Sequence, residues 1–216
     1  MYGFVLLAVL RFLPVTNFNP FSLRLDKLSP VYTPETKGER GKAAVLIALI
    51  DQGSDTEIIY TRRADHLNSH AGQVSFPGGM WEPEDDDLAA TALRESEEEI
   101  GLHRALPQVL GAAPVRPSKN GVEVLPVVAI LNEVPSLQAN ADEIADIFRV
   151  PIRWFYENAP TYVDVLARQK KSFRVPAWDY QGFDIWGLTA VFTYELLWRM
   201  NIPINLQNSP ERHLHT

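Results

Sequence analysis

Residues 85–101 read DDDLAATALRESEEEIG, and this segment decides the fold. Its apolar residues recur at the spacing of one helix face: Leu88, Ala92, Leu93 and Ile100. The acids at its start suit the positive end of the helix dipole, and Gly101 is a typical C-terminal stop. We therefore expect a helix over residues 85–100 that packs one face against a core.

Three carboxylates share another face of this helix. Glu95, Glu98 and Glu99 are spaced i, i+3 and i+4, so their side chains project from one side. Like charges this close repel each other, and the acids of residues 84–87 are expected to add to the repulsion. A bound cation would compensate it, and a ligand set of oxygens alone favours Mg2+ or Mn2+ over zinc. The alternative is an acidic helix face that is simply exposed to solvent.

The residues that frame these glutamates favour a site over a plain surface. Gly79 precedes the helix and Gly101 follows it, whereas a solvent-exposed face needs no glycine at either end. Arg94 stands directly before the first glutamate, where its guanidinium can brace a neighbouring carboxylate. The pattern therefore indicates a metal site on this helix.

Two apolar runs upstream predict a hairpin at the centre of a sheet. Residues 43–50 (AAVLIALI) and 57–61 (EIIYT) have strand length, and the turn sequence DQGSD separates them. Further elements are expected later in the chain: strands over 122–131, 161–166 and 183–186, and an amphipathic helix over 188–200. Together these elements predict an α+β or mixed α/β fold.

The composition disfavours several classes of protein. The 216 residues include 27 Asp and Glu against 20 Lys and Arg, a formal net charge of -7, which argues against a nucleic-acid-binding surface. There is no cysteine, so the chain has neither a disulfide framework nor a thiolate metal site. This is compatible with a cytoplasmic protein. The length suits one well-packed domain, and the oligomeric state is left open.

The two ends of the chain differ in character from the middle. Residues 1–13 are apolar but lack a preceding basic segment and are too short to span a bilayer, so no membrane anchor is expected. Residues 30–40 are rich in Pro, Gly and charge, which is typical of a linker. We therefore expect three parts: an N-terminal extension and linker (1–41), one domain (42–201) and a C-terminal tail (202–216). A structural protein tethered to a membrane by its apolar start is the minority alternative.

The pattern Arg-Glu, two residues, Glu-Glu, one residue, Gly over residues 94–101 resembles the Nudix box of the Nudix hydrolases. The usual spacing of that box would place a Gly at Met80 and a Glu at Asp86, so both positions depart from it. A spacing one residue longer, from Gly79 to Arg94, is that of the branch containing the coenzyme A pyrophosphatases. The resemblance implies a Nudix-type α/β/α sandwich with a mixed central sheet and a loop-helix-loop catalytic box.

A second signature ahead of the box is similar to the same branch. A strand ending in Thr61 is followed by two arginines and then by HAGQVSFPGG over residues 70–79. Asn68 stands where the branch usually has an Arg, so one of the two arginines is expected to contact phosphate instead. The glycines would let the backbone approach a phosphate closely. The residues expected to bind substrate are Arg62, Arg63, Gly78 and Gly79.

The resemblance also implies roles for the acidic residues. Glu95 and Glu99 would be the principal metal ligands, and Glu98 either a third ligand or the base that orients water. Arg94 would brace them. Glu143, on a later loop, is the second candidate for the base, and a plain surface acid is the competing interpretation of it.

These roles describe metal-dependent hydrolysis of a pyrophosphate bond in a nucleoside diphosphate derivative. The resemblance implies coenzyme A or its derivatives as substrate, giving 4'-phosphopantetheine and adenosine 3',5'-bisphosphate. The alternatives are ADP-ribose or a dinucleotide as substrate, or a module that senses a nucleotide without cleaving it. Such a module should have lost a box carboxylate, whereas this chain keeps all three. Trp81 is a candidate for stacking on adenine, and His66 and His70 are left out of the metal site.

Overall fold

The computed structural model describes residues 38–168, 171–207 and 209–213. A larger, eight-stranded sheet contains β1 (Lys42–Asp51), β2 (Thr56–Arg63), β3 (Val74–Ser75), β4 (Gly78–Met80), β5 (Gln108–Ala112), β6 (Arg116–Pro117), β7 (Glu123–Leu131) and β8 (Ile144–Pro151). A smaller, four-stranded sheet contains β9 (Tyr162–Arg168), β10 (Lys171–Tyr180), β11 (Phe183–Ile185) and β12 (Glu211–His213). The helices of these ranges are α2 (Leu88–Ile100), α3 (Ile152–Glu157) and α4 (Gly187–Arg199).

The larger sheet is built around β1. Strands β1 and β2 form an antiparallel hairpin in which Leu49 pairs with Ile58, as the two apolar runs predicted. On its other side β1 pairs in parallel with β7, with Ile47 opposite Val128. The strand order is β3-β2-β1-β7-β5, while β4, β6 and β8 pair with β1, β7 and β2. The sheet is therefore mixed, and the predicted hairpin lies at its centre.

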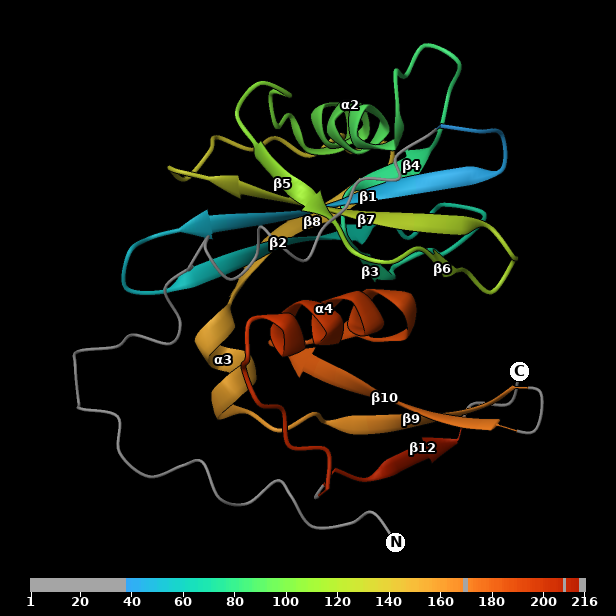
Figure 1. Cartoon of the computed structure of the whole chain (residues 1–216), viewed down its shortest axis with the longest axis vertical. Helices are drawn as coiled ribbons and strands as arrows, with labels where there is room; N and C mark the ends of the chain where they lie inside the picture. The colour runs from blue at the N-terminus through green and yellow to red at the C-terminus, as the bar shows by residue number, and fades with distance from the viewer. Residues whose placement is uncertain (1–37, 169–170, 208, 214–216) are drawn as a thin grey trace, which may run out of the picture.

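Strand β1 is apolar along its length because both faces of the sheet are covered. Leu46 points into a core that it shares with Leu88 of α2. Its neighbour Ile47 points the other way, into a core that it shares with Phe192 of α4. Figure 1 shows α2 above the sheet and α4 below it. This confirms the expected α/β/α arrangement.

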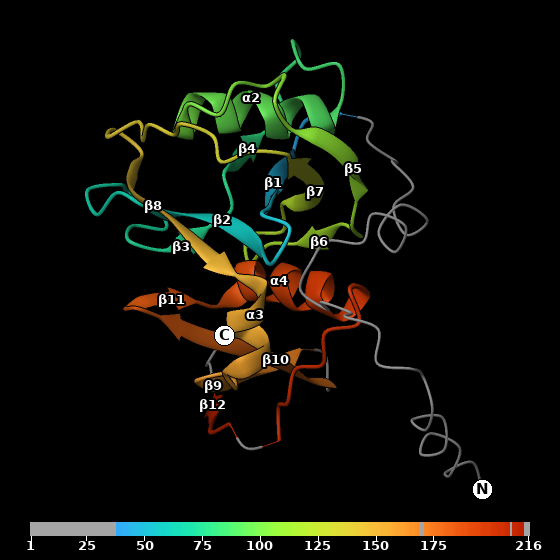
Figure 2. The ribbon, with the colours of Figure 1, turned by 90° about the vertical axis from the view of Figure 1, so that its left-hand side faces the viewer.

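The smaller sheet lies beyond α4, on the side away from the larger sheet (Figures 1 and 2). Its strands β9 and β10 are antiparallel, and β12 joins β9 in parallel. Arg212 of β12 donates from Nε and Nη2 to the carboxylate of Asp164 at 2.6 and 3.1 Å, and the Asp164 side chain is only 1% exposed. Residues 211–213, within the predicted C-terminal tail, therefore form part of this sheet.

Helix α2 begins three residues later than expected. Asp87 is its N-cap, and its Oδ1 accepts a hydrogen bond from the N–H of Ala90 at 2.8 Å. The prediction that the helix starts at Asp85 is wrong, because the acids precede the first turn and one of them caps it. Gly101 has a φ of 68°, and its N–H donates to the carbonyl of Glu97, so it is the expected C-terminal stop.

The remaining expectations have mixed outcomes. The second helix is α4, whose ends are each one residue earlier than predicted. The expectations for residues 1–13 and for most of the linker lie outside the described residues, which begin at Gly38. Within the described ranges, the helices are all too short or too polar to cross a lipid bilayer.

Candidate active site

Gly78 and Gly79 bring the backbone of β4 between β1 and the acidic helix. Strand β4 pairs with the start of β1, with Ala44 opposite Gly79. A Cβ on Gly78 would lie 2.3 Å from the carbonyl oxygen of Ala44, and one on Gly79 would lie 2.4 Å from the carboxylate carbon of Glu95. A side chain at Gly78 would meet the main chain of β1, whereas one at Gly79 would have to displace the Glu95 carboxylate, so the two glycines allow this close approach.

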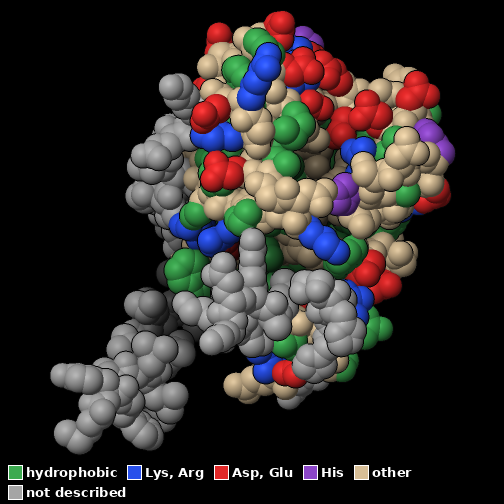
Figure 3. Space-filling model, turned by 90° about the vertical axis from the view of Figure 1, so that its right-hand side faces the viewer, with side chains coloured by type: hydrophobic (Ala, Val, Ile, Leu, Met, Phe, Trp, Pro, Cys, Tyr) green, Lys and Arg blue, Asp and Glu red, His purple; other side chains and the backbone are tan. Residues whose placement is uncertain are grey.

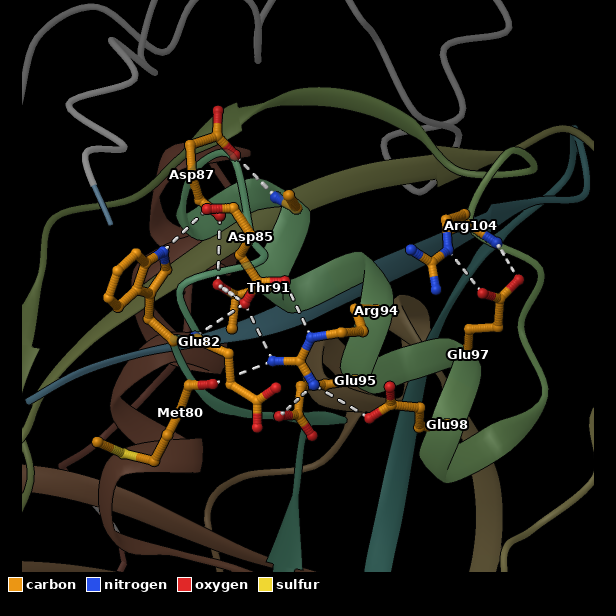
Figure 4. Close-up of polar contacts among 12 residues, drawn as sticks. Met80, Glu82, Asp85, Asp87, Thr91, Arg94, Glu95, Glu97, Glu98 and Arg104 are labelled. Atoms are coloured by element: carbon orange, nitrogen blue, oxygen red, sulfur yellow. Dashed lines mark hydrogen bonds and ion pairs between the residues drawn. The ribbon is translucent and has the colours of Figure 1, made fainter. Parts of the chain in front are cut away.

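Arg94 is the centre of the polar contacts on α2 (Figure 4). Its Nη1 donates to Oε1 of Glu95 and to Oε2 of Glu98, both at 3.0 Å. Its Nε and Nη2 donate to the two oxygens of Asp85 at 2.9 and 3.0 Å, and Nη2 also donates to the carbonyl of Met80 at 3.1 Å. One guanidinium thus holds two of the box glutamates and the loop before the helix in fixed relation.

Asp85 is a site residue that the sequence analysis missed. Its side chain is 4% exposed and also accepts hydrogen bonds from Thr91 Oγ1 at 2.8 Å and the N–H of Glu82 at 3.1 Å. Burial acts to raise the pKa of Asp85, but the bonds from Arg94, Glu82 and Thr91 outweigh it and hold the pKa below its usual range. The family spacing indicated Asp86, which is exposed, because this box is one residue longer. Counting forward from Gly79 would have found Asp85.

Two of the four acids at residues 84–87 have local partners that offset their charge. Asp85 is paired with Arg94, and Asp87 caps α2. These two carboxylates therefore have partners of their own next to the helix face that carries the glutamates.

Glu99 is the most buried of the box glutamates, at 3% exposure. Its Oε2 accepts a hydrogen bond from the N–H of Gly78 at 3.0 Å, and Oε1 lies 3.5 Å from Nη1 of Arg63. Burial raises the pKa of Glu99 to about 7, although Gly78 and Arg63 oppose the shift. The charges of Glu95 and Glu143 raise it further.

Glu95, Glu98 and Glu143 face the same region. Burial raises the pKa of Glu95; Arg94 opposes this, and the charges of Glu98 and Glu143 add to it. Glu98 is more open, with a side chain 55% exposed. The charge of Glu143 acts on both Glu95 and Glu99, and its main chain is linked to the end of α2 through Asn140, whose N–H donates to the carbonyl of Glu99 and whose carbonyl accepts from the N–H of Glu143.

The charge balance of this region suits a divalent cation. Five carboxylates (Asp85, Glu95, Glu98, Glu99 and Glu143) stand against the two guanidiniums of Arg63 and Arg94. Figure 3 shows acidic side chains gathered over the end of the molecule that carries α2. The donors are all oxygens, as Mg2+ and Mn2+ prefer. In the described residues no three acidic or histidine side chains are already grouped as they would be around a metal ion.

The two candidate arginines differ in their surroundings. Arg63 points to Glu99, and its Nε is buried with no hydrogen-bond acceptor among the described residues. Arg62 instead donates from Nε to Asp146 at 2.6 Å and from Nη1 to Asp65 at 2.7 Å. Arg63 therefore lies against the acidic helix, whereas Arg62 is paired with Asp65 and Asp146.

Four further residues from the sequence analysis lie around the site. Trp81 is half-buried against the core below α2 and donates from Nε1 to the carbonyl of Asp85 at 3.2 Å, and its stacking on adenine stays a prediction. Asn68 is exposed on the loop after β2. His66 and His70 bond to Asp142 and Gln73 and to none of the box glutamates.

Known proteins resemble this chain in both sequence and structure. A family model described as the NUDIX domain matches residues 40–171. Two bacterial relatives are each described as an uncharacterized Nudix hydrolase NudL. The one from Photorhabdus laumondii is 40% identical over 161 residues, which are 74% of this chain and 85% of the relative. The one from Yersinia enterocolitica is 37% identical over 160 residues, which are 74% of this chain and 82% of the relative. Among solved structures, a C. elegans Ap4A hydrolase is 18% identical, with a TM-score of 0.45 over 52% of this chain and 81% of that chain.

Proposed function

Because this chain belongs to the Nudix family, whose hydrolases act on pyrophosphate bonds of nucleotide derivatives, we propose that its substrate is coenzyme A or a derivative of it. The products would be 4'-phosphopantetheine and adenosine 3',5'-bisphosphate. The choice of substrate is supported by the signature over residues 58–79 and by the longer spacing from Gly79 to Arg94. The observation that carries the reaction itself is the group of box glutamates packed against Gly78 and Gly79 with excess negative charge.

The metal ligands in this proposal are Glu95, Glu98 and Glu99. Arg94 occupies one oxygen each of Glu95 and Glu98, which leaves their other oxygens for a cation. Burial and mutual repulsion raise the pKa of Glu95 and Glu99, and a nearby cation would relieve both effects. When bound, Mg2+ or Mn2+ would neutralise charge on the phosphoryl oxygens and acidify a water molecule.

Glu143 is the base that we favour. Its side chain is exposed and bonds to no described residue, whereas Glu98 is held by Arg94. Glu143 would accept a proton from water as the water oxygen bonds to one phosphorus atom. The bond from that phosphorus to the bridging oxygen breaks, and the bridging oxygen leaves with the electron pair on the second phosphate. The proton then passes from Glu143 to solvent.

Arg63 is the arginine that we assign to the pyrophosphate. A buried N–H with no acceptor costs about 1–3 kcal/mol, and a phosphate oxygen would satisfy the Nε of Arg63. Arg62 then has a supporting role, since Asp65 and Asp146 already take its donors. This assignment supplies the phosphate contact that Asn68 does not.

Product analysis by chromatography tests the proposal. Purified protein is incubated with coenzyme A, with ADP-ribose and with a diadenosine polyphosphate, each with Mg2+ or Mn2+ and with a chelator. We expect adenosine 3',5'-bisphosphate from coenzyme A, and no product after chelation. The Glu99→Gln variant serves as the control for a contaminating hydrolase.

Each other outcome would contradict a different part of the proposal. Cleavage of ADP-ribose or the dinucleotide alone would keep the pyrophosphatase chemistry and reject coenzyme A. Binding without cleavage of any compound would favour a nucleotide-sensing module. Cleavage that survives chelation would reject the metal ligands.

A further inference from the structure

The loop after β2, residues 64–73, lies against the segment that carries Glu143. The N–H of Ala64 donates to the carbonyl of Glu143 at 2.8 Å. Nε2 of His66 lies 3.1 Å from the carbonyl oxygen of Asp142. A carbonyl oxygen only accepts hydrogen bonds, so Nε2 carries the proton in this contact. The two peptide groups that flank Glu143 are therefore both held by this loop.

The same segment is also fixed to the acidic helix. The N–H of Asn140 donates to the carbonyl of Glu99 at 2.8 Å, and the carbonyl of Asn140 accepts from the N–H of Glu143 at 2.9 Å. Glu143 thus has a short main-chain connection to the end of α2, where the box glutamates lie. His66 supplies the opposite support, from the loop after β2.

The pairing of strands β2 and β8 has an irregularity next to Glu143 in sequence. Arg62 pairs with Asp146, but Arg63 pairs with Ile144, so one residue of β8 is skipped at this point. Such bulges bend a strand and change the direction of the side chains beside them. The bulge lies close to Glu143 in sequence. The ion pair between Arg62 and Asp146 lies at its other end.

We propose that His66 is a positioning residue for Glu143. Its hydrogen bond to the Asp142 carbonyl holds the adjacent Glu143 at the angle from which the carboxylate reaches the attacking water. This inference rests on the proposed function, in which Glu143 is the base. It gives the signature ahead of the box a second role, because the loop orients the base rather than only binding phosphate.

A double-mutant cycle between His66 and Glu143 tests this role. We expect His66→Ala to lower kcat about 10- to 100-fold with little change in KM, since a small misplacement of a catalytic group has an effect of that size. His66→Gln, whose side-chain amide can donate to the same carbonyl, should recover most of the rate. In a Glu143→Gln background, His66→Ala should have no further effect on kcat.

His70→Asn is the matched control. His70 lies in the same loop and is exposed like His66, but it bonds to Gln73 within the loop. Its φ of 56° is one that Asn tolerates. This variant should keep the wild-type kcat.

Amide hydrogen exchange supplies a readout that does not depend on substrate. Exchange over residues 140–146 should be faster in His66→Ala than in the wild type, and near normal in His66→Gln and His70→Asn. Unchanged exchange in His66→Ala, or a loss of kcat that persists in the Glu143→Gln background, would overturn the role of His66. Absence of pyrophosphate cleavage by the wild type would instead reject the proposed function, and with it the base that His66 is proposed to position.

Discussion

Glu99→Gln should change the pH dependence of stability in the metal-free protein. Glu99 is 3% exposed, and its pKa rises from 4.5 to about 7 on folding. The side chain of the variant keeps an oxygen that can accept from the Gly78 N–H, but it does not ionise. The comparison therefore isolates the cost of a buried negative charge.

The sign of the effect follows from the direction of the shift. A raised pKa means that the folded state binds the proton more tightly than the unfolded chain does. The free energy of unfolding of the wild type therefore falls as pH rises from 4.5 to 7, because only the unfolded chain has lost the proton in that window. The difference between a pKa of 4.5 and one of about 7, at about 1.4 kcal/mol for each pH unit, gives about 3.5 kcal/mol. We expect the wild type and Glu99→Gln to have nearly equal free energies of unfolding at low pH. At pH 8 the free energy of unfolding of the variant should be higher by up to this amount.

Urea unfolding followed by circular dichroism, with a chelator present, measures the difference between the two proteins at pH 5 and pH 8. Excess Mg2+ should reduce the difference at pH 8, because the cation binds the ionised carboxylate of the wild type. Glu97→Gln is the matched control on the same helix. Arg104 lowers the pKa of Glu97, so this variant should be less stable than the wild type at pH 8, and the gap should close as pH falls. A difference between wild type and Glu99→Gln that does not vary with pH would refute the reasoning.

Three further changes have defined outcomes. Gly79→Ala places a methyl group against the Glu95 carboxylate, so Mg2+ affinity measured by calorimetry should fall while the circular dichroism spectrum is unchanged. Glu98→Gln should lower kcat by about 100-fold or more, with little change in the midpoint of unfolding because this side chain is exposed. If the variant turns over substrate at the wild-type rate, Glu98 is not a metal ligand. Arg212→Ala should lower the free energy of unfolding by about 3 kcal/mol, because it leaves the buried Asp164 carboxylate unpaired. The exposed pair of Arg174 and Glu211 is the comparison, and Arg174→Ala should have an effect below about 1 kcal/mol in the same urea titration.

The parts of the fold that sequence could predict are those with strong periodic patterns. The continuous apolar run of β1 reflects burial on both faces of the sheet, and the helical spacing of α2 reflects burial on one face of the helix. Strand β10 was not predicted, since it contains Pro176, a residue that argues against a strand paired on both sides. Strand β8 alternates poorly, with half of its residues only partly buried. Strand β12 is three residues long, too short for any pattern.

The candidate site shows the same division. The common face of Glu95, Glu98 and Glu99 follows from helix geometry alone, which is local. The pairing of Asp85 with Arg94 depends on the path of a loop that is one residue longer than usual. The contact between His66 and Asp142 joins residues 76 positions apart, and only the pairing of β2 with β8 brings them together. The spacing of residues also says nothing about burial, so the sequence does not show that Glu99 is enclosed whereas Glu98 is open to solvent.

Strand β12 also sets the order in which a nascent chain can finish folding. The guanidinium that pairs with Asp164 belongs to a residue 48 positions later. At about 5–20 residues per second, a ribosome needs about 2–10 s to add that stretch. Until then β9 has an open edge and a carboxylate that must stay hydrated, so the smaller sheet is expected to close only after the larger sheet has assembled around β1.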